Sequence, residues 1–160
     1  MTTDPQTVAW LDQEDANLAQ LVRAHRWAVQ YVGEGDGPDE PPFGYTVGLF
    51  GLGHPELALV GLAAESTHSL LGRVAEMIGD GRDLVPGELL TWSDWPDVRV
   101  VVEELPNPGE VVLVANRFYE RPAEFSVPAY QLTWALPDHG FPWEGTAEPS
   151  VQPRPGTWRA

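Results

Sequence analysis

The stretch "FGYTVGLFGLGHPEL", residues 43–57, is the part of the sequence that predicts the fold most directly. Over residues 43–48, bulky Phe, Tyr and Val alternate with Gly, Thr and Gly, which is typical of a β-strand with one bulky face and one nearly bare face. A bare face allows close approach, either by a packed helix or by a ligand. The sequence leaves both interpretations open and slightly favours packing by a helix.

The segments around this stretch predict an α+β fold, in which two or three helices pack on a mainly antiparallel sheet. Apolar residues recur at helical spacing between Leu70 and Ile78, so residues 63–81 are predicted as a helix. A first helix is predicted to begin at Asp12 or Asp15 and to end near His25. Strands are predicted at residues 27–32, 43–48, 57–60, 98–105 and 126–136, with an extended segment at 84–92; residues 110–121 fit a strand by composition and a helix by spacing, and the helix is favoured.

The length of 160 residues suits a single domain. We expect residues 1–10 to be a mobile lead-in, residues 11–145 to form the domain, and residues 146–160 to be a Pro-rich tail without a core pattern. The first residues lack the basic and apolar regions of a signal peptide, and no apolar run is long enough to cross a membrane. A cytoplasmic location is therefore predicted.

Charge is the strongest global feature, because 24 acidic and 9 basic residues give a net charge of −15. Such a field repels phosphate groups, so neither nucleic acid nor a membrane surface is predicted as a partner. The basic residues are all Arg, and without Lys there can be neither a Schiff base nor a P-loop lysine. The absence of Cys excludes thiolate chemistry and Cys-ligated metals. The expected partner is a protein, including another copy of the chain, or a small molecule, and no cofactor is predicted.

Two short segments carry the groups best suited to chemistry. His54 and Glu56 follow the Gly-rich turn, and Asp138 and His139 follow the last predicted strand. As acid–base groups, the candidates are His54, Glu56 and Asp138. If the two segments converge, all four side chains supply nitrogen and oxygen ligands for a metal. The competing interpretation is a turn in which Pro55 fixes the backbone and the His and Glu side chains have no catalytic role.

Six motifs in order, "FGYTVGL", "GHPEL", "VGL", "VPGE", "RFY" and "QLTWALPDHGFPWE", resemble the bacterial domain-of-unknown-function family 4262 (DUF4262) over about residues 25–144. The family brings no established activity. The resemblance implies that a common set of positions belongs together: Tyr45, Thr46, Gly48, His54, Pro55, Glu56, Gln131, Asp138, Pro142 and Trp143.

The leading hypothesis is a non-catalytic binding module with one pocket lined by aromatic, Gly and Thr residues. The predicted ligand-binding residues are Tyr45, Thr46, Gly48, His54, Gln131 and Trp143. One alternative is an enzyme that uses a His and a carboxylate as acid and base, with or without a metal. Another is a flavin-binding oxidoreductase that resembles a split barrel, because a strand of small residues precedes a hydrophobic strand.

Overall fold

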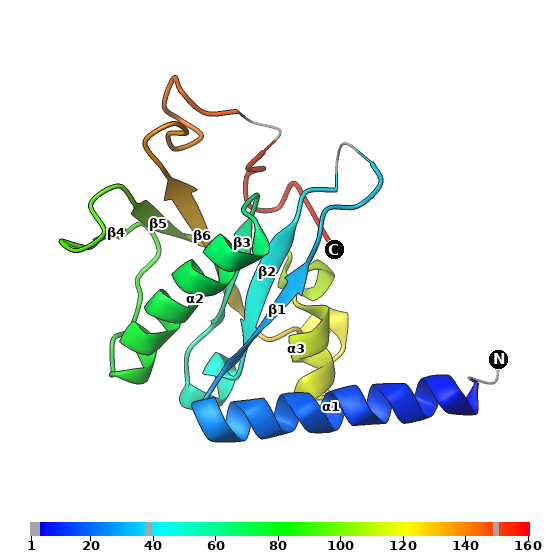
Figure 1. Cartoon of the computed structure of the whole chain (residues 1–160). Coiled ribbons are helices and arrows are strands. Elements are labelled where there is room, and N and C mark those ends of the chain that lie inside the picture. Colours follow the sequence, from blue (N-terminus) through cyan, green and yellow to red (C-terminus); the bar gives the residue numbers. More distant parts are fainter. Residues whose placement is uncertain (1–3, 38–39, 149–150) are drawn as a thin grey trace.

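The computed structural model of the chain describes residues 4–37, 40–148 and 151–160. It has the predicted α+β architecture, with helices packed on a six-stranded sheet (Figure 1). The elements are α1 (Pro5–His25), β1 (Ala28–Val32), β2 (Phe43–Val47), β3 (Glu56–Val60), α2 (Ala64–Gly79), β4 (Leu89–Thr91), β5 (Arg99–Glu104), α3 (Leu113–Phe118) and β6 (Ala129–Ala135), with short 3-10 helices at Leu49–Leu52, Pro108–Glu110 and Ala123–Phe125.

The strand order is β1-β2-β3-β6-β5-β4, and neighbouring strands are antiparallel except for β3 and β6. The parallel pair is short, since β3 is in register with β6 only from Glu56 opposite Ala129 to Ala58 opposite Gln131. Beyond Gln131, β6 continues to Ala135 beside β5 alone. One edge of β6 is therefore left without a strand partner.

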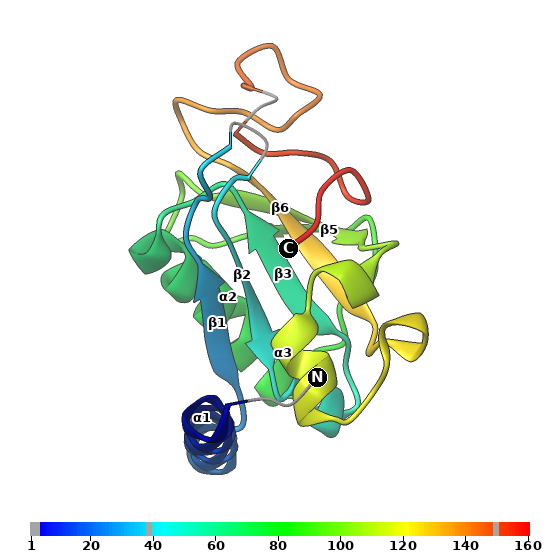
Figure 2. The same ribbon diagram turned by 90° about the vertical axis from the view of Figure 1, so that its right-hand side faces the viewer.

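Helix α2 covers one face of the sheet, while α3 and the C-terminal residues cover the other (Figures 1 and 2). On the α2 side, the core is built from the apolar stripe of α2 and the Leu, Val and Trp residues of β3, β5 and β6. On the other side, Phe43, Tyr45 and Val47 of β2 pack with α3 residues and with Trp158. The sheet is thus the central layer of three.

The bare face of β2 is used for helix packing. A Cβ atom placed on Gly44 would lie 2.5 Å from Thr67 Cγ2 and 3.5 Å from Leu71 Cδ1, both on α2. Thr46 is completely buried in the same layer. Packing against the predicted helix, rather than binding of a planar ligand, therefore explains the small residues, and the surface that suggested flavin binding is covered by α2.

Helix α1 begins earlier than the sequence predicted. Asp4 caps it by accepting a hydrogen bond from the Thr7 N–H, and Pro5 takes the first helical position, where its missing N–H costs nothing. The expected lead-in over residues 1–10 is therefore wrong from Pro5 onward, and residues 1–3 lie outside the described residues. None of the helices described, α1 included, has the length and hydropathy needed to span a membrane.

The expected C-terminal tail is also different. Gln152 is 1% exposed and Trp158 is 7% exposed, and both pack against the sheet. We call residues 151–160 the C-terminal arm; residues 149–150 of the predicted tail lie outside the described residues. The sequence showed no core pattern here, yet the segment contributes two buried side chains, Gln152 and Trp158, which are too few to make an apolar periodicity.

We expect Gly44→Ala to lower the free energy of unfolding by about 1–3 kcal/mol, because the new methyl group overlaps Thr67 on α2. Urea unfolding measures the change. The control is Gly72→Ala on α2, where nothing lies within 4 Å of the new Cβ. That substitution should raise the free energy of unfolding by about 0.5–1 kcal/mol through helix propensity. Equal effects of the two substitutions would contradict the packing role of Gly44.

Candidate functional site

The carboxylate of Glu56 is completely buried beneath the turn that joins β2 to β3. Its Oε1 atom accepts hydrogen bonds from Thr46 Oγ1 at 2.8 Å and from the Leu49 N–H at 3.1 Å. Its Oε2 atom accepts from the N–H groups of Gly48 and Phe50 at 3.0 and 3.1 Å. The structure therefore brings Thr46, Gly48 and Glu56 together in one buried hydrogen-bonded unit.

Four donors around two oxygens suit an ionised carboxylate, which can only accept hydrogen bonds. Burial raises the pKa of the Glu56 carboxyl, and the hydrogen bonds from Thr46 and the three backbone N–H groups oppose that rise. Gly48 reaches this position with a φ of 128°, which favours Gly. Because these oxygens are occupied and inaccessible, Glu56 is held as a structural group in this conformation.

His54 is also engaged in the structure. Its Nδ1 lies 2.7 Å from the Pro55 carbonyl, and its Nε2 accepts a hydrogen bond from the Leu84 N–H at 3.2 Å. Since an N–H group can only donate, Nε2 is unprotonated and the imidazole carries its proton on Nδ1. His54 therefore ties the connection between α2 and β4 to the start of β3.

The four proposed metal ligands are not assembled. His54 and Glu56 lie where β3 begins, whereas Asp138 and His139 follow the end of β6, which runs parallel to β3. The two pairs are thus at opposite ends of the sheet. Asp138 is exposed in a turn, and His139 contacts the Gly140 carbonyl and the Glu148 N–H. Among the described residues, no group of three His, Asp or Glu side chains is placed to hold a metal.

Tyr45 points away from the Glu56 unit and into the layer formed by α3. Its hydroxyl oxygen accepts a hydrogen bond from the Val114 N–H at 3.0 Å, and its ring stacks with Phe43. Burial raises the pKa of Tyr45 to about 12. The predicted pocket that combines Tyr45 with the Gly and Thr residues is therefore absent, because these side chains lie on different faces of β2.

A different set of polar groups lies on the sheet face opposite α2. Glu103 of β5 is directly opposite Gln131 of β6, and Thr133 follows two residues later on the same face. Thr133 donates a hydrogen bond from Oγ1 to Glu103 at 2.5 Å. We call Glu103, Gln131 and Thr133 the polar row. It is unusual because Gln131 and Thr133 are completely buried in the middle of a sheet.

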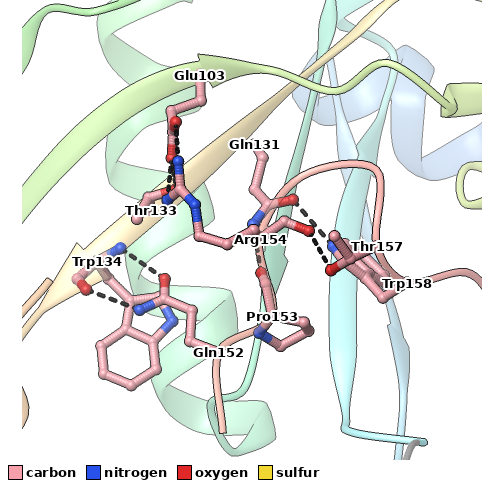
Figure 3. A network of polar contacts seen from close by, with 9 residues as sticks. All are labelled: Glu103, Gln131, Thr133, Trp134, Gln152, Pro153, Arg154, Thr157 and Trp158. Carbon is pink, nitrogen blue, oxygen red and sulfur yellow. Dashed lines mark hydrogen bonds and ion pairs between the residues drawn. The ribbon is translucent and has the colours of Figure 1, made fainter. Parts of the chain in front are cut away.

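The C-terminal arm supplies the partners of the polar row (Figure 3). Arg154 donates to both carboxylate oxygens of Glu103, at 2.8 and 2.6 Å. Gln131 donates to the Pro153 carbonyl at 3.2 Å and accepts from Trp158 Nε1 at 3.0 Å. The row is therefore satisfied by an arginine, an indole N–H and a backbone carbonyl from one segment.

Gln152 occupies the free edge of β6. Its amide accepts from the Trp134 N–H at 2.9 Å and donates to the Trp134 carbonyl at 3.0 Å (Figure 3). These are the two backbone groups that a neighbouring strand would bind. The side chain thus takes the place of the strand that is missing where β3 ends.

Trp143 stands at the border of the arm. It is 56% exposed, stacks with Phe141 at 4.8 Å between ring centroids, and lies 5.2 Å from the Arg154 guanidinium. Arg99 lies 4.6 Å from the Phe141 ring. Each ring of the aromatic pair therefore has a guanidinium group beside it, a favourable cation–π arrangement. The hydrogen bonds from Arg99 lower the pKa of the nearby Glu144 carboxyl.

Two clefts border the arm. One of about 430 Å³ is lined by Phe43, Trp158 and residues of the β1–β2 loop. Another of about 520 Å³ is lined by Glu103, Arg154 and residues near β4. The arm therefore has open space beside both its arginine and its tryptophan.

Sequence reasoning identified Gln131 and Trp143 but missed Glu103, Thr133, Gln152, Arg154 and Trp158. Thr133 and Glu103 had a signal, since polar residues at alternate positions of a strand mark its second face. The arm also carried a signal in Pro155-Gly156, because Pro followed by Gly is the usual centre of a type II turn. Pairing between the two segments had no local signal.

Comparison with family models identifies DUF4262, described as a domain of unknown function, over residues 21–148. The match covers most of the chain, which therefore belongs to this family. The comparisons with curated proteins and with solved structures gave no match. The matched range includes the polar row and Trp143, and it ends before the C-terminal arm.

We expect Glu56→Gln to lower the free energy of unfolding by about 2–4 kcal/mol, because an amide has one acceptor oxygen for four converging donors. Urea unfolding at neutral pH measures the loss. Glu104→Gln is the matched control, since Glu104 is exposed on β5 and should change stability little. A Glu56→Gln variant as stable as the control would show that the four hydrogen bonds do not stabilise the turn.

We expect the Tyr45 phenol to ionise with a midpoint of about 12, against an ordinary value of 10.0. Because the pKa is raised in the folded state, the stability that Tyr45 contributes is fully present below pH 10 and is lost as the pH rises through about 12. Ultraviolet titration of the wild type and of Tyr45→Phe isolates this group by difference. A difference signal centred at the ordinary value would refute the burial of the phenol.

Proposed function

We propose that this member of the DUF4262 family is a non-catalytic binding module for a protein partner, and that a segment of the partner binds over Glu103, Gln131 and Thr133. The observation that carries the proposal is the polar row itself. Buried polar groups on a sheet face need hydrogen-bond partners, and within this chain those partners come from a separate segment.

The chemistry of the face suits a cationic peptide segment. Glu103 offers both oxygens to one guanidinium, and Gln131 offers an amide oxygen and an amide N–H. Trp143 adds an exposed ring beside the guanidinium site. The net charge of −15 favours the approach of a basic segment.

The engagement of the proposed acid–base groups also supports binding over catalysis. Glu56 has its carboxylate oxygens filled by four donors, and His54 contacts backbone groups through both ring nitrogens. An enzyme built on these two side chains would have to break contacts that hold the start of β3. Binding over the polar row leaves the start of β3 intact and exchanges the contacts of the C-terminal arm alone.

The test uses the full chain with the arm weakened by Gln152→Ala and Trp158→Ala, which leaves the polar row intact. The probe is a fluorescently labelled peptide, VQPRPGTWRA, with the sequence of residues 151–160. We expect binding in the micromolar range by fluorescence anisotropy, because the peptide regains the contacts that the weakened arm has lost.

Adding Glu103→Gln to the weakened chain should reduce peptide affinity about tenfold, because the amide cannot accept a bidentate guanidinium. Glu104→Gln, on the same strand but exposed, is the matched control and should leave the affinity unchanged. A folded, weakened chain that binds no peptide would overturn the proposed function.

A further inference from the structure

The C-terminal arm crosses the sheet face from β5 to β2. Arg154 binds Glu103 on β5, Gln152 binds the backbone of Trp134 on β6, and the Trp158 ring packs on Phe43 of β2 with 5.2 Å between centroids. Figure 3 shows these side chains pointing from the arm into the face. A single segment thus contacts β5 and β6 in one half of the sheet and β2 in the other.

A tight turn gives the arm this reach. The Thr157 N–H donates to the Arg154 carbonyl at 3.1 Å, and Thr157 Oγ1 donates to the same oxygen at 2.7 Å. Between them, Pro155 and Gly156 form the centre of the turn, and Gly156 has a φ of 85°, as a type II turn requires. The turn separates the arginine, which faces β5, from the tryptophan, which faces β2.

The arm is recognised chiefly through side chains. Pro153 and Pro155 have no backbone N–H, so the segment cannot add to the sheet as a regular strand. In place of the backbone hydrogen bonds of a strand, the arm offers the amide of Gln152, the guanidinium of Arg154 and the indole of Trp158. Each of these groups binds a residue within the range that the family model matches. A segment that presents these three groups, and a backbone carbonyl to Gln131, in the same arrangement satisfies the polar row equally well.

We infer that residues 151–160 are a built-in occupant of the binding face formed by Glu103, Gln131 and Thr133. A partner segment must displace them, and it carries an arginine between prolines, with an amide side chain before the arginine and an aromatic residue after it. This inference rests on the proposed function and names both its ligand class and its regulation. The arm keeps the polar row satisfied while no partner is bound. Binding then exchanges one set of contacts for an equivalent set and exposes no unpaired polar group.

The anchoring of the arm suits release. The Arg154 and Glu103 side chains are 43% and 21% exposed, so water can replace their contact at low cost. Clefts lie beside both Arg154 and Trp158, so an entering segment has room at either end before the arm has left. The other anchors of the arm are the buried side chains of Gln152 and Trp158, whose contacts opening must also break.

The Trp134 amide reports arm opening directly, because its N–H donates to the Gln152 side chain. The Leu105 amide, which donates to the Ala129 carbonyl at 3.1 Å, reports opening of the sheet. In amide hydrogen exchange followed by NMR, we expect Arg154→Ala to speed exchange at Trp134 about tenfold and to leave Leu105 unchanged. Arg154 does not touch the Trp134 amide, so this response requires the arm to leave as one unit.

The matched control is Arg73→Ala on α2. Arg73 also binds a carboxylate through two hydrogen bonds, to Asp94, and also lies over aromatic rings, those of Trp92 and Trp95, but it is on the other face of the sheet. It should change neither amide. Equal rates at Trp134 and Leu105 that rise together in Arg154→Ala would overturn the inference, as would an unprotected Trp134 amide in the wild type.

The peptide VQPRPGTWRA separates failure of this inference from failure of the proposed function. We expect the wild-type chain to bind it at least about tenfold more weakly than the chain with Gln152→Ala and Trp158→Ala, because the intact arm competes from within. If the wild-type and weakened chains bind the peptide with equal, measurable affinity, the inference that the arm is a built-in occupant is overturned, and the proposed binding function is not. Faster Trp134 exchange in Arg154→Ala, together with no peptide binding to the weakened chain, would overturn the binding function alone.

Discussion

The placement of Glu56 is the constraint on which the sheet depends. Its carboxylate gathers the N–H groups of the turn after β2, and its own backbone N–H donates to the Pro128 carbonyl at 3.0 Å, just before β6. One residue therefore fixes both the connection from β2 to β3 and the register of the parallel pair. Because that register places Ala58 opposite Gln131, it also determines where β3 ends and where the free edge of β6 begins.

The buried Glu56 carboxylate and the polar row thus both depend on the register of β3 and β6. They differ in where along the chain their hydrogen-bond partners lie. The donors to Glu56 lie 6 to 10 residues away in the chain, so forming the turn assembles them. The partners of the polar row lie 22 to 51 residues away, on a segment beyond the family match. Distant partners are held at a larger entropic cost of loop closure. The first unit is therefore part of the fold, whereas the second is the one that we propose to be open to exchange.

The sequence predicted the elements whose side chains repeat at regular spacing. It missed the features that depend on hydrogen bonds between distant segments. The strands at β2, β5 and β6, the helix α2 and the packing role of Gly44 all follow from spacing and side-chain size. Glu56 looked reactive because a sequence does not show that four donors converge on it. The convergence of His54 and Glu56 with Asp138 and His139 failed because strand order was unknown. The arm was missed because a single Trp and a single Gln make no repeating pattern.

Charge explains why arginine, rather than another group, belongs at the centre of the proposed binding face, which is formed by Glu103, Gln131 and Thr133. Five of the nine basic residues form ion pairs within the described part of the chain, and carboxylates outnumber basic groups across the whole sequence. A segment without a cation would cover Glu103 and leave it with Thr133 as its remaining hydrogen-bond partner, at a cost in desolvation. Lysine would restore the charge but not the planar, bidentate contact or the stacking on Trp143. We therefore expect selectivity at this face to depend on the geometry of the guanidinium as well as on its charge.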